Sequence, residues 1–88
     1  MTLLLLLLGC TPTCEQTCRK LIRCGEVPSD GVSEFRCTES CNDQIDLYQL
    51  WDDTQLQEKQ EAARRCVGDN ECAQIADGVC YDEDMYIY

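Results

Sequence analysis

The cysteines carry most of the reactive chemistry in this chain, which has nine of them in 88 residues. Cys14 and Cys18 lie four residues apart, and so do Cys37 and Cys41. On a helix this spacing places both side chains of a pair on one face. In an antiparallel helical hairpin the cysteines nearest the turn meet first. The spacing therefore predicts the disulfides Cys18–Cys37 and Cys14–Cys41.

Four further cysteines follow at less regular spacings, namely Cys24, Cys66, Cys72 and Cys80. Four cysteines allow three pairings, and the sequence alone does not choose among them. A third helix that runs back beside the second would return Cys66 to the end where Cys24 closes the first helix. This arrangement favours Cys24–Cys66 and leaves Cys72–Cys80 around a short fourth helix.

Metal binding and catalysis fit the residues less well than disulfides do. The chain has no Cys-x-x-Cys, the close spacing on which thioredoxin-type redox sites and many structural zinc sites depend. It also has no histidine, which excludes His-based triads and mixed Cys/His zinc sites. The acidic run at 82–84, with Asp77 nearby, lacks the ligand spacing and the internal glycine of a calcium-binding loop. We therefore expect no metal, no cofactor and no enzymatic activity.

Length and charge restrict the possible partners. A chain of 88 residues supports one small domain, and such domains commonly need disulfides because their cores are small. Seventeen acidic residues against seven basic ones give a net charge of −10. This charge would repel a phosphate backbone, so nucleic acid is excluded as an expected partner.

Apolar periodicity and turn residues predict four helices and no strand. The expected helices cover residues 12–23, 33–51 and 54–68, with a short one between 69 and 78. The expected N-caps are Thr11 or Thr13 (with Gln16), Ser33, Thr54, and Asp69 or Asn70. The predicted fold class is all-α. It is a small disulfide-stapled bundle in which an antiparallel Cys-x3-Cys hairpin is joined by a third helix and a short fourth.

Two apolar stripes should face the core of this bundle. On the second helix the stripe is Cys37, Cys41, Ile45 and Tyr48, and on the third it is Leu56, Ala63, Cys66 and Val67. Tyr48 and Trp51 are most simply core residues, with an exposed binding patch as the alternative. Arg64 and Arg65 are expected to interact favourably with the carboxyl end of the third helix through its dipole.

The first ten residues differ in character from the rest. Six consecutive leucines at 3–8 lead into Gly9 and Cys10. The run has no amphipathic face and is far shorter than the ~20 apolar residues that span a bilayer. It is typical of the apolar region of a secretory signal peptide, with a small residue before the cut. We therefore expect a cleaved signal peptide over 1–9, a cysteine-rich helical domain over 10–80, and an acidic and aromatic tail over 81–88.

The string Leu7-Leu8-Gly9-Cys10 resembles the lipobox of bacterial lipoproteins, in which the cysteine carries a diacylglyceryl group and becomes the first residue after cleavage. The resemblance implies that Cys10 is the lipidated residue and that a membrane is the partner it contacts. One thioether leaves eight cysteines, which pair without remainder. By the same resemblance, Thr11 in the position after the lipidated cysteine points to the outer membrane.

The cysteine pattern as a whole is similar to that of small cysteine-rich lipoproteins predicted in myxobacteria. In those proteins Cys-x3-Cys-x5-Cys, then Cys-x3-Cys, then a final cysteine cluster follow a lipobox. The expected function is that of a membrane-anchored, non-catalytic lipoprotein of the cell envelope with a binding or scaffolding role. The twin Cys-x3-Cys spacing also resembles plant hairpin inhibitors, channel toxins and small intermembrane-space chaperones. It leaves two alternatives open: a secreted inhibitor or toxin-like protein, and a chaperone-like protein for apolar segments.

Overall fold

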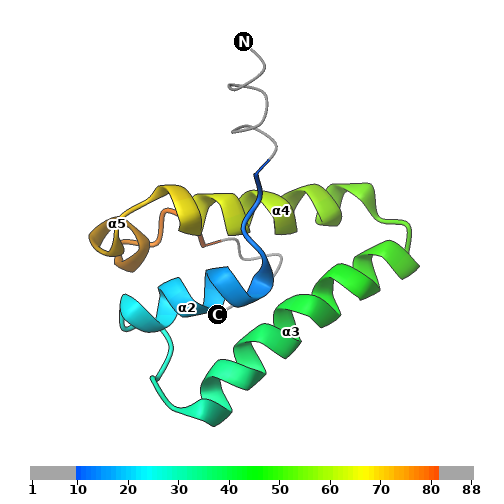
Figure 1. The fold of residues 1–88 in the computed structure, drawn as a ribbon. Coiled ribbons are helices and arrows are strands. Elements are labelled where there is room, and N and C mark those ends of the chain that lie inside the picture. The colour runs from blue at the N-terminus through cyan, green and yellow to red at the C-terminus, as the bar shows by residue number, and fades with distance from the viewer. Residues whose placement is uncertain (1–9, 82–88) are drawn as a thin grey trace.

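The computed structural model describes residues 10–81 and contains four helices (Figure 1). In chain order they are α2 (Cys14–Arg23), α3 (Gly31–Leu50), α4 (Thr54–Asp69) and α5 (Cys72–Ala76). Residues 10–81 include no strand, and the predicted all-α, disulfide-stapled class is confirmed. No helix in this part of the chain combines the length and the apolar character that a membrane crossing requires.

Helix α2 begins at a capping box. The Thr13 hydroxyl accepts a hydrogen bond from the backbone N–H of Gln16 at 3.1 Å, and the Gln16 side chain accepts one from the Thr13 N–H at 2.9 Å. This reciprocal pair satisfies two donors that the helix itself leaves unpaired. Of the two predicted N-caps, Thr13 with Gln16 is therefore confirmed, and Pro12 lies just before the helix instead of in its first turn, where the predicted range 12–23 placed it.

Helix α3 begins two residues earlier than predicted because Asp30, not Ser33, is its N-cap. The Asp30 carboxylate accepts the Ser33 backbone N–H at 2.8 Å and the Ser33 hydroxyl at 2.9 Å. Both hydrogen bonds favour the charged carboxylate and hold the pKa of Asp30 below its ordinary value. Ser33 is the third helical residue and assists the cap, since an ionised carboxylate is a stronger acceptor than a hydroxyl at this position.

The last two helices also differ slightly from their predicted starts. Asp53, not Thr54, caps α4 by accepting the Leu56 backbone N–H at 3.0 Å. At α5 the N-cap is Glu71, whose backbone N–H donates to the Gln74 side chain at 2.9 Å. The predicted cap at residue 69 or 70 is wrong because α4 continues through Asp69 and uses that segment for its own end.

Helices α2, α3 and α4 each pack against the other two, and α5 follows the end of α4 (Figure 1). The main core cluster consists of Leu21, Val67, Ile75 and Cys80. A second cluster near the turn between α3 and α4 consists of Tyr48 and Ala63, with Leu56 packed against it. The half-cystines at 14, 18 and 41 are buried as well. Sulfur therefore fills much of the interior that larger domains fill with aliphatic side chains.

Three helix ends share a Schellman motif, in which the residue after the C-cap adopts a left-handed backbone conformation. At α2 and α5 this residue is a glycine, Gly25 with φ 78° and Gly78 with φ 88°. At α3 it is Asp52, with φ 54°. The N–H groups of Asp52 and Asp53 each donate to a carbonyl in the last turn of α3 at 3.1 Å. A side chain in this conformation is strained, and a carboxylate at a helix carboxyl end opposes the dipole.

Replacing this strained residue should stabilise the protein. We expect Asp52→Gly to raise the free energy of unfolding by about 0.5–1 kcal/mol, because glycine removes both the steric and the dipole penalty. Urea denaturation of the disulfide-bonded protein measures the change. Asp52→Asn serves as the control, since it removes the charge but retains a side chain. A glycine variant less stable than the wild type would contradict this account of the turn.

Candidate functional site

The two predicted disulfides of the helical hairpin are confirmed. Cys14 bonds Cys41 with a Cα–Cα distance of 5.6 Å, and Cys18 bonds Cys37 with a Cα–Cα distance of 6.0 Å. The pair nearest the connection between α2 and α3 is the inner one, as an antiparallel hairpin requires. Because the four-residue spacing recurs on both helices, these bridges fix the register of α2 against α3.

The other two disulfides correct the predicted pairing. Cys24 bonds Cys72 (Cα–Cα 5.0 Å) and Cys66 bonds Cys80 (Cα–Cα 5.6 Å), so Cys24–Cys66 and Cys72–Cys80 are both wrong. Helix α4 does run back toward the end of α2, but it extends one turn beyond Cys66. The residue that reaches Cys24 is therefore the one that opens α5. Cys66 lies within α4, where Cys80 meets it after the chain has reversed at Gly78.

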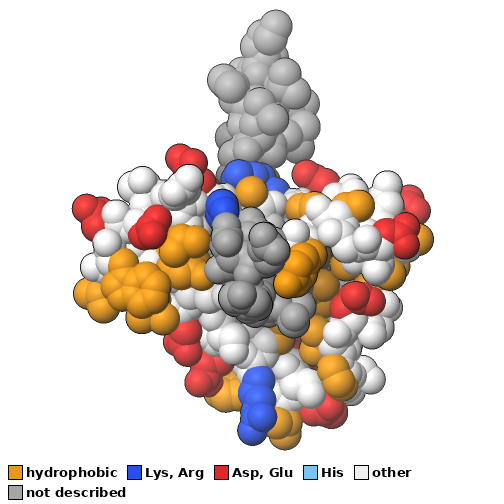
Figure 2. Space-filling model, turned by 180° about the vertical axis from the view of Figure 1, so that it is seen from behind, with side chains coloured by type: hydrophobic (Ala, Val, Ile, Leu, Met, Phe, Trp, Pro, Cys, Tyr) orange, Lys and Arg blue, Asp and Glu red, His pale blue; other side chains and the backbone are white. Residues whose placement is uncertain are grey.

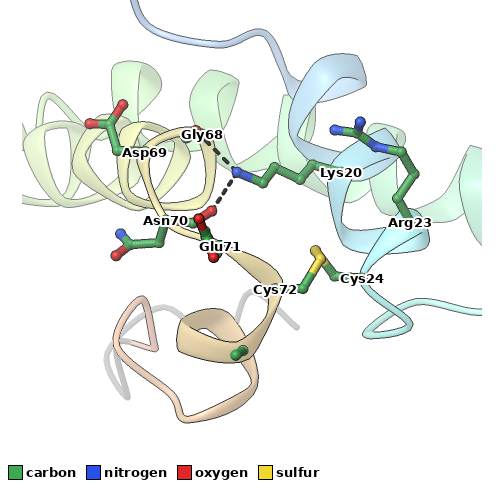
Figure 3. A pocket seen from close by; sticks show the side chains of 9 residues that line it. Lys20, Arg23, Cys24, Gly68, Asp69, Asn70, Glu71 and Cys72 are labelled. Carbon is green, nitrogen blue, oxygen red and sulfur yellow. Dashed lines mark hydrogen bonds between the residues drawn. A yellow bond between two sulfur atoms is a disulfide. The ribbon is translucent and has the colours of Figure 1, made fainter.

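Lys20 of α2 contacts the end of α4 beside the Cys24–Cys72 disulfide (Figure 3). The Lys20 ammonium donates to the backbone carbonyl of Gly68 at 3.1 Å and also to that of Asn70. Carbonyls at a helix carboxyl end lack partners within the helix and attract a cation, so Lys20 satisfies two of them. This contact and the Cys24–Cys72 bond together explain why the first residue of α5 lies against the end of α2.

The open groove around Lys20 has a volume of about 670 Å³. Its charged side chains are Lys20, Arg23, Asp69 and Glu71, and their charges sum to zero. Lys20 is already engaged by helix carbonyls, which leaves the groove without a concentrated charge for a ligand. Residues 10–81 also hold no group of three or more potential metal ligands. Of the acidic residues considered for calcium, Asp77 is the C-cap of α5, and 82–84 lie outside the described residues.

Cys10 is the one cysteine within residues 10–81 that has no disulfide partner, and it is exposed. The segment that follows it is fixed to α4. The Arg64 guanidinium donates to the carbonyl of Pro12 at 2.9 Å, and Arg65 donates to the hydroxyl of Thr11 at 3.1 Å. The chain is therefore tied to the folded domain from the residue after Cys10 onward.

Arg64 also connects this segment to the interior. Its Nε donates to the side-chain oxygen of Gln60 at 2.7 Å, and the Gln60 amide contacts the sulfur of Cys41 at 3.3 Å. Gln60 is buried, so Arg64 satisfies an acceptor that water does not reach. Partial burial lowers the pKa of Arg64, an effect that the nearby Glu61 opposes. The expected role of Arg64 and Arg65 at the helix dipole did not include these contacts, because a long-range hydrogen bond leaves no local pattern in the sequence.

Pro12 packs closely on Gly68 of α4. A Cβ atom at position 68 would lie 2.9 Å from the Pro12 Cγ, which is closer than two carbon atoms normally approach. The glycine near the end of α4 is therefore required by this contact. The contact between Pro12 and Gly68 and the hydrogen bonds from Arg64 and Arg65 together fix Thr11 and Pro12 in one position on α4.

The aromatic pair at the end of α3 separates into one buried and one exposed residue. Tyr48 is 7% exposed and belongs to the second core cluster, whereas Trp51 is 60% exposed. Their ring centroids lie 6.0 Å apart. The core interpretation is thus correct for Tyr48 and wrong for Trp51, which is the C-cap residue of α3 and stays exposed beside the Tyr48 ring.

Comparisons with protein-family models, with curated proteins and with solved structures return no match to this chain. Any inference about function must therefore come from the residues of this chain. They are the exposed thiol of Cys10 on its fixed segment, and the exposed apolar side chains at the end of α3.

The seat of Pro12 can be tested with a double-mutant cycle. We expect Gly68→Ala to lower the free energy of unfolding by about 1 kcal/mol, because the new methyl group clashes with Pro12. In a Pro12→Ala background the same change should instead stabilise the protein by about 0.5–1 kcal/mol, through the better helix propensity of alanine. Urea denaturation of the four proteins gives the coupling. Equal effects of Gly68→Ala in both backgrounds would show that the contact is absent.

The stability contributed by the Cys24–Cys72 disulfide can also be tested. The Cys24–Cys72 bridge spans 48 residues, so its loss in a Cys24→Ala/Cys72→Ala variant should cost about 4 kcal/mol on the chain-entropy model. Cys72 is exposed and Cys24 is half-buried at the edge of the main core cluster, so alanine there removes little buried volume. Mass spectrometry of a non-reduced digest of the wild type identifies the linked peptides. Urea denaturation of the wild type and the variant measures the change in the free energy of unfolding. A peptide joining Cys24 to Cys66 would refute the assignment.

Proposed function

We propose that this chain is a membrane-anchored, non-catalytic lipoprotein of the cell envelope, attached through a lipid on Cys10. Its helical domain would bind or scaffold other molecules there. One observation carries the proposal. Cys10 is left out of the disulfide set, is exposed, and stands where the predicted signal peptide 1–9 ends.

The state of the other cysteines supports export. All eight are in disulfides, which persist in oxidising compartments and are uncommon in a reducing cytosol. An exported chain with one remaining thiol after Leu7-Leu8-Gly9 fits the lipobox pattern. Lipidation would place a diacylglyceryl group on the sulfur and an acyl chain on the new amino terminus. More than one acyl chain is what stable membrane attachment requires.

The contacts of the amino-terminal segment suit a chain that starts at Cys10. Arg65 contacts Thr11, Arg64 contacts Pro12, and the α2 cap begins at Thr13. All three would be retained after cleavage between Gly9 and Cys10. The domain would therefore keep its described fold in the processed form. Thr11, as the residue after the anchor, favours the outer membrane by the lipoprotein pattern.

The proposed role is binding and not catalysis because the described residues offer no reactive pair. The chain has no histidine, and the eight bonded cysteines are not nucleophiles in their oxidised state. The groove at Lys20 is lined by balanced charges, and its lysine is occupied by helix carbonyls.

Fractionation of cells tests the anchor. In a Gram-negative host we expect the wild-type chain in the outer-membrane fraction, with an intact mass that matches a lipidated form starting at Cys10. Cys10→Ser should leave the membrane fraction, because it lacks the thiol that forms the thioether. The Cys24→Ala/Cys72→Ala variant is the matched control, since it removes two cysteines but keeps Cys10 and should remain in the membrane.

Two results would count against the proposal. A Cys10→Ser chain that still fractionates with the membrane would show that another feature holds it there. A secreted, unlipidated wild-type chain would favour the inhibitor or toxin-like alternative.

A further inference from the structure

An exposed apolar surface lies at the carboxyl end of α3. It consists of Leu47, Leu50 and Trp51, which are 42%, 78% and 60% exposed. We call these three residues, together with the nearby carboxylates of Asp43, Asp46 and Asp52, the Trp51 patch. Residues three and four apart on a helix share a face, so the three apolar side chains are neighbours. Figure 2 shows hydrophobic side chains gathered at the left edge of the molecule, the end where α3 meets α4.

Two carboxylates of the Trp51 patch, those of Asp43 and Asp46, lie on the same side of α3 as its leucines. Asp43 precedes Leu47 by one turn, and Asp46 precedes Leu50 by one turn. All three carboxylates are exposed. No Lys or Arg occurs anywhere from residue 37 to residue 58, whereas the acidic residues there are Glu39, Asp43, Asp46, Asp52, Asp53 and Glu58. The apolar surface thus belongs to a stretch of chain whose charged residues are all acidic, and the nearest basic residues along the chain are Arg36 and Lys59.

Asp52 occupies a backbone position that glycine would fill with less strain. Glycine occupies the equivalent left-handed position at the ends of α2 and α5, but this position carries Asp52 with φ 54°. A strained, charged residue beside an exposed tryptophan is more readily explained by a role in recognition than by a role in folding. The charge contributes to the field around Trp51 and Leu50.

Charge also decides what can cover this surface. A second copy of the chain would bring the same carboxylates against one another, and like charges in contact disfavour association. The chain's own segment 82–84 is acidic, and anionic lipid headgroups would be repelled in the same way. The complementary occupant is a basic one with an apolar side. Residues 10–81 contain no strand edge that could pair with an extended peptide, whereas the outer side of α3 offers a helical surface.

We infer that the Trp51 patch binds a basic amphipathic helix of a partner protein. Apolar side chains of that helix pack against Leu47, Leu50 and Trp51, and its lysines or arginines face the flanking carboxylates. The inference rests on the binding role proposed above and specifies its partner, but it does not depend on lipid attachment at Cys10.

Fluorescence provides a local measurement because Trp51 is the single tryptophan of the chain. The titration uses the disulfide-bonded full chain carrying Cys10→Ser, and the probe is a synthetic helix of 18 residues with leucine on one face and lysine on the other. We expect a blue shift of the Trp51 emission on binding, as the ring leaves water. Leu50→Ser should weaken binding about tenfold through lost apolar burial. Asp43→Asn/Asp46→Asn should weaken it about fivefold and flatten its dependence on salt.

Matched controls separate the patch from general effects. Val79→Ser changes another exposed apolar residue away from α3, and Glu26→Gln removes an exposed carboxylate from the loop after α2. Both should bind the probe as well as the parent chain does. A shuffled peptide of equal composition, without an apolar face, should bind at least about tenfold more weakly. Circular dichroism confirms that each variant is folded.

Three outcomes would overturn the inference. The first is equal binding of the shuffled peptide, or of a peptide with glutamate in place of lysine. The second is equal affinity in the Leu50→Ser and Val79→Ser variants. The third is a dimer, seen by sedimentation, that Leu50→Ser dissociates, which would make the patch a contact between copies. None of these results bears on the fractionation of Cys10→Ser, so failure of the patch and failure of the anchor are distinguishable.

Discussion

Covalent bonds between helices are the constraint on which this fold depends. The main cluster of buried side chains has only Leu21, Val67 and Ile75 besides sulfur, too little apolar surface to hold four helices together unaided. Each disulfide removes conformational freedom from the unfolded chain and fills interior volume in the folded one. Two bridges align α2 with α3, and the other two attach the final segment to α2 and α4. Because the disulfides hold the helices together, fewer positions on the helices need apolar side chains, and more of them can carry charge.

The parts of this structure that follow from helical spacing were predictable, and the parts that depend on the path of connections were not. Four-residue spacing on α2 and α3 was enough to pair their cysteines correctly. The end of α4 was predicted within one residue, so the pairing of Cys24, Cys66, Cys72 and Cys80 depends instead on the path of the chain after α4, where α5 opens beside Cys24 and the chain reverses at Gly78. The hydrogen bonds of Arg64 and Arg65 to Pro12 and Thr11 were beyond sequence reasoning for the same reason. The exposed thiol of Cys10, by contrast, agrees with the odd number of cysteines.

Charge is distributed unevenly over the domain. Arg64 and Arg65 lie on α4, where they hold the amino-terminal segment, whereas every charged residue from 37 to 58 is acidic. The thiol proposed as an attachment point and the acidic, apolar surface of α3 thus belong to different elements. A domain built in this way separates the site that attaches it from the surface that meets other molecules. The proposed lipid on Cys10 and the proposed helix partner would not compete for space.

The seating of Thr11 and Pro12 on α4 also limits how far the domain can move. Anything attached to Cys10 is one residue away from a hydrogen-bonded position, and one residue of extended chain reaches only about 3.5 Å. A long flexible leash would let the domain tumble and search a large volume, because its reach grows with the square root of its length. Here the connection is too short for such a search. The helices of the domain therefore stay close to whatever is attached at Cys10, and α3 would meet other molecules only within a short distance of that attachment.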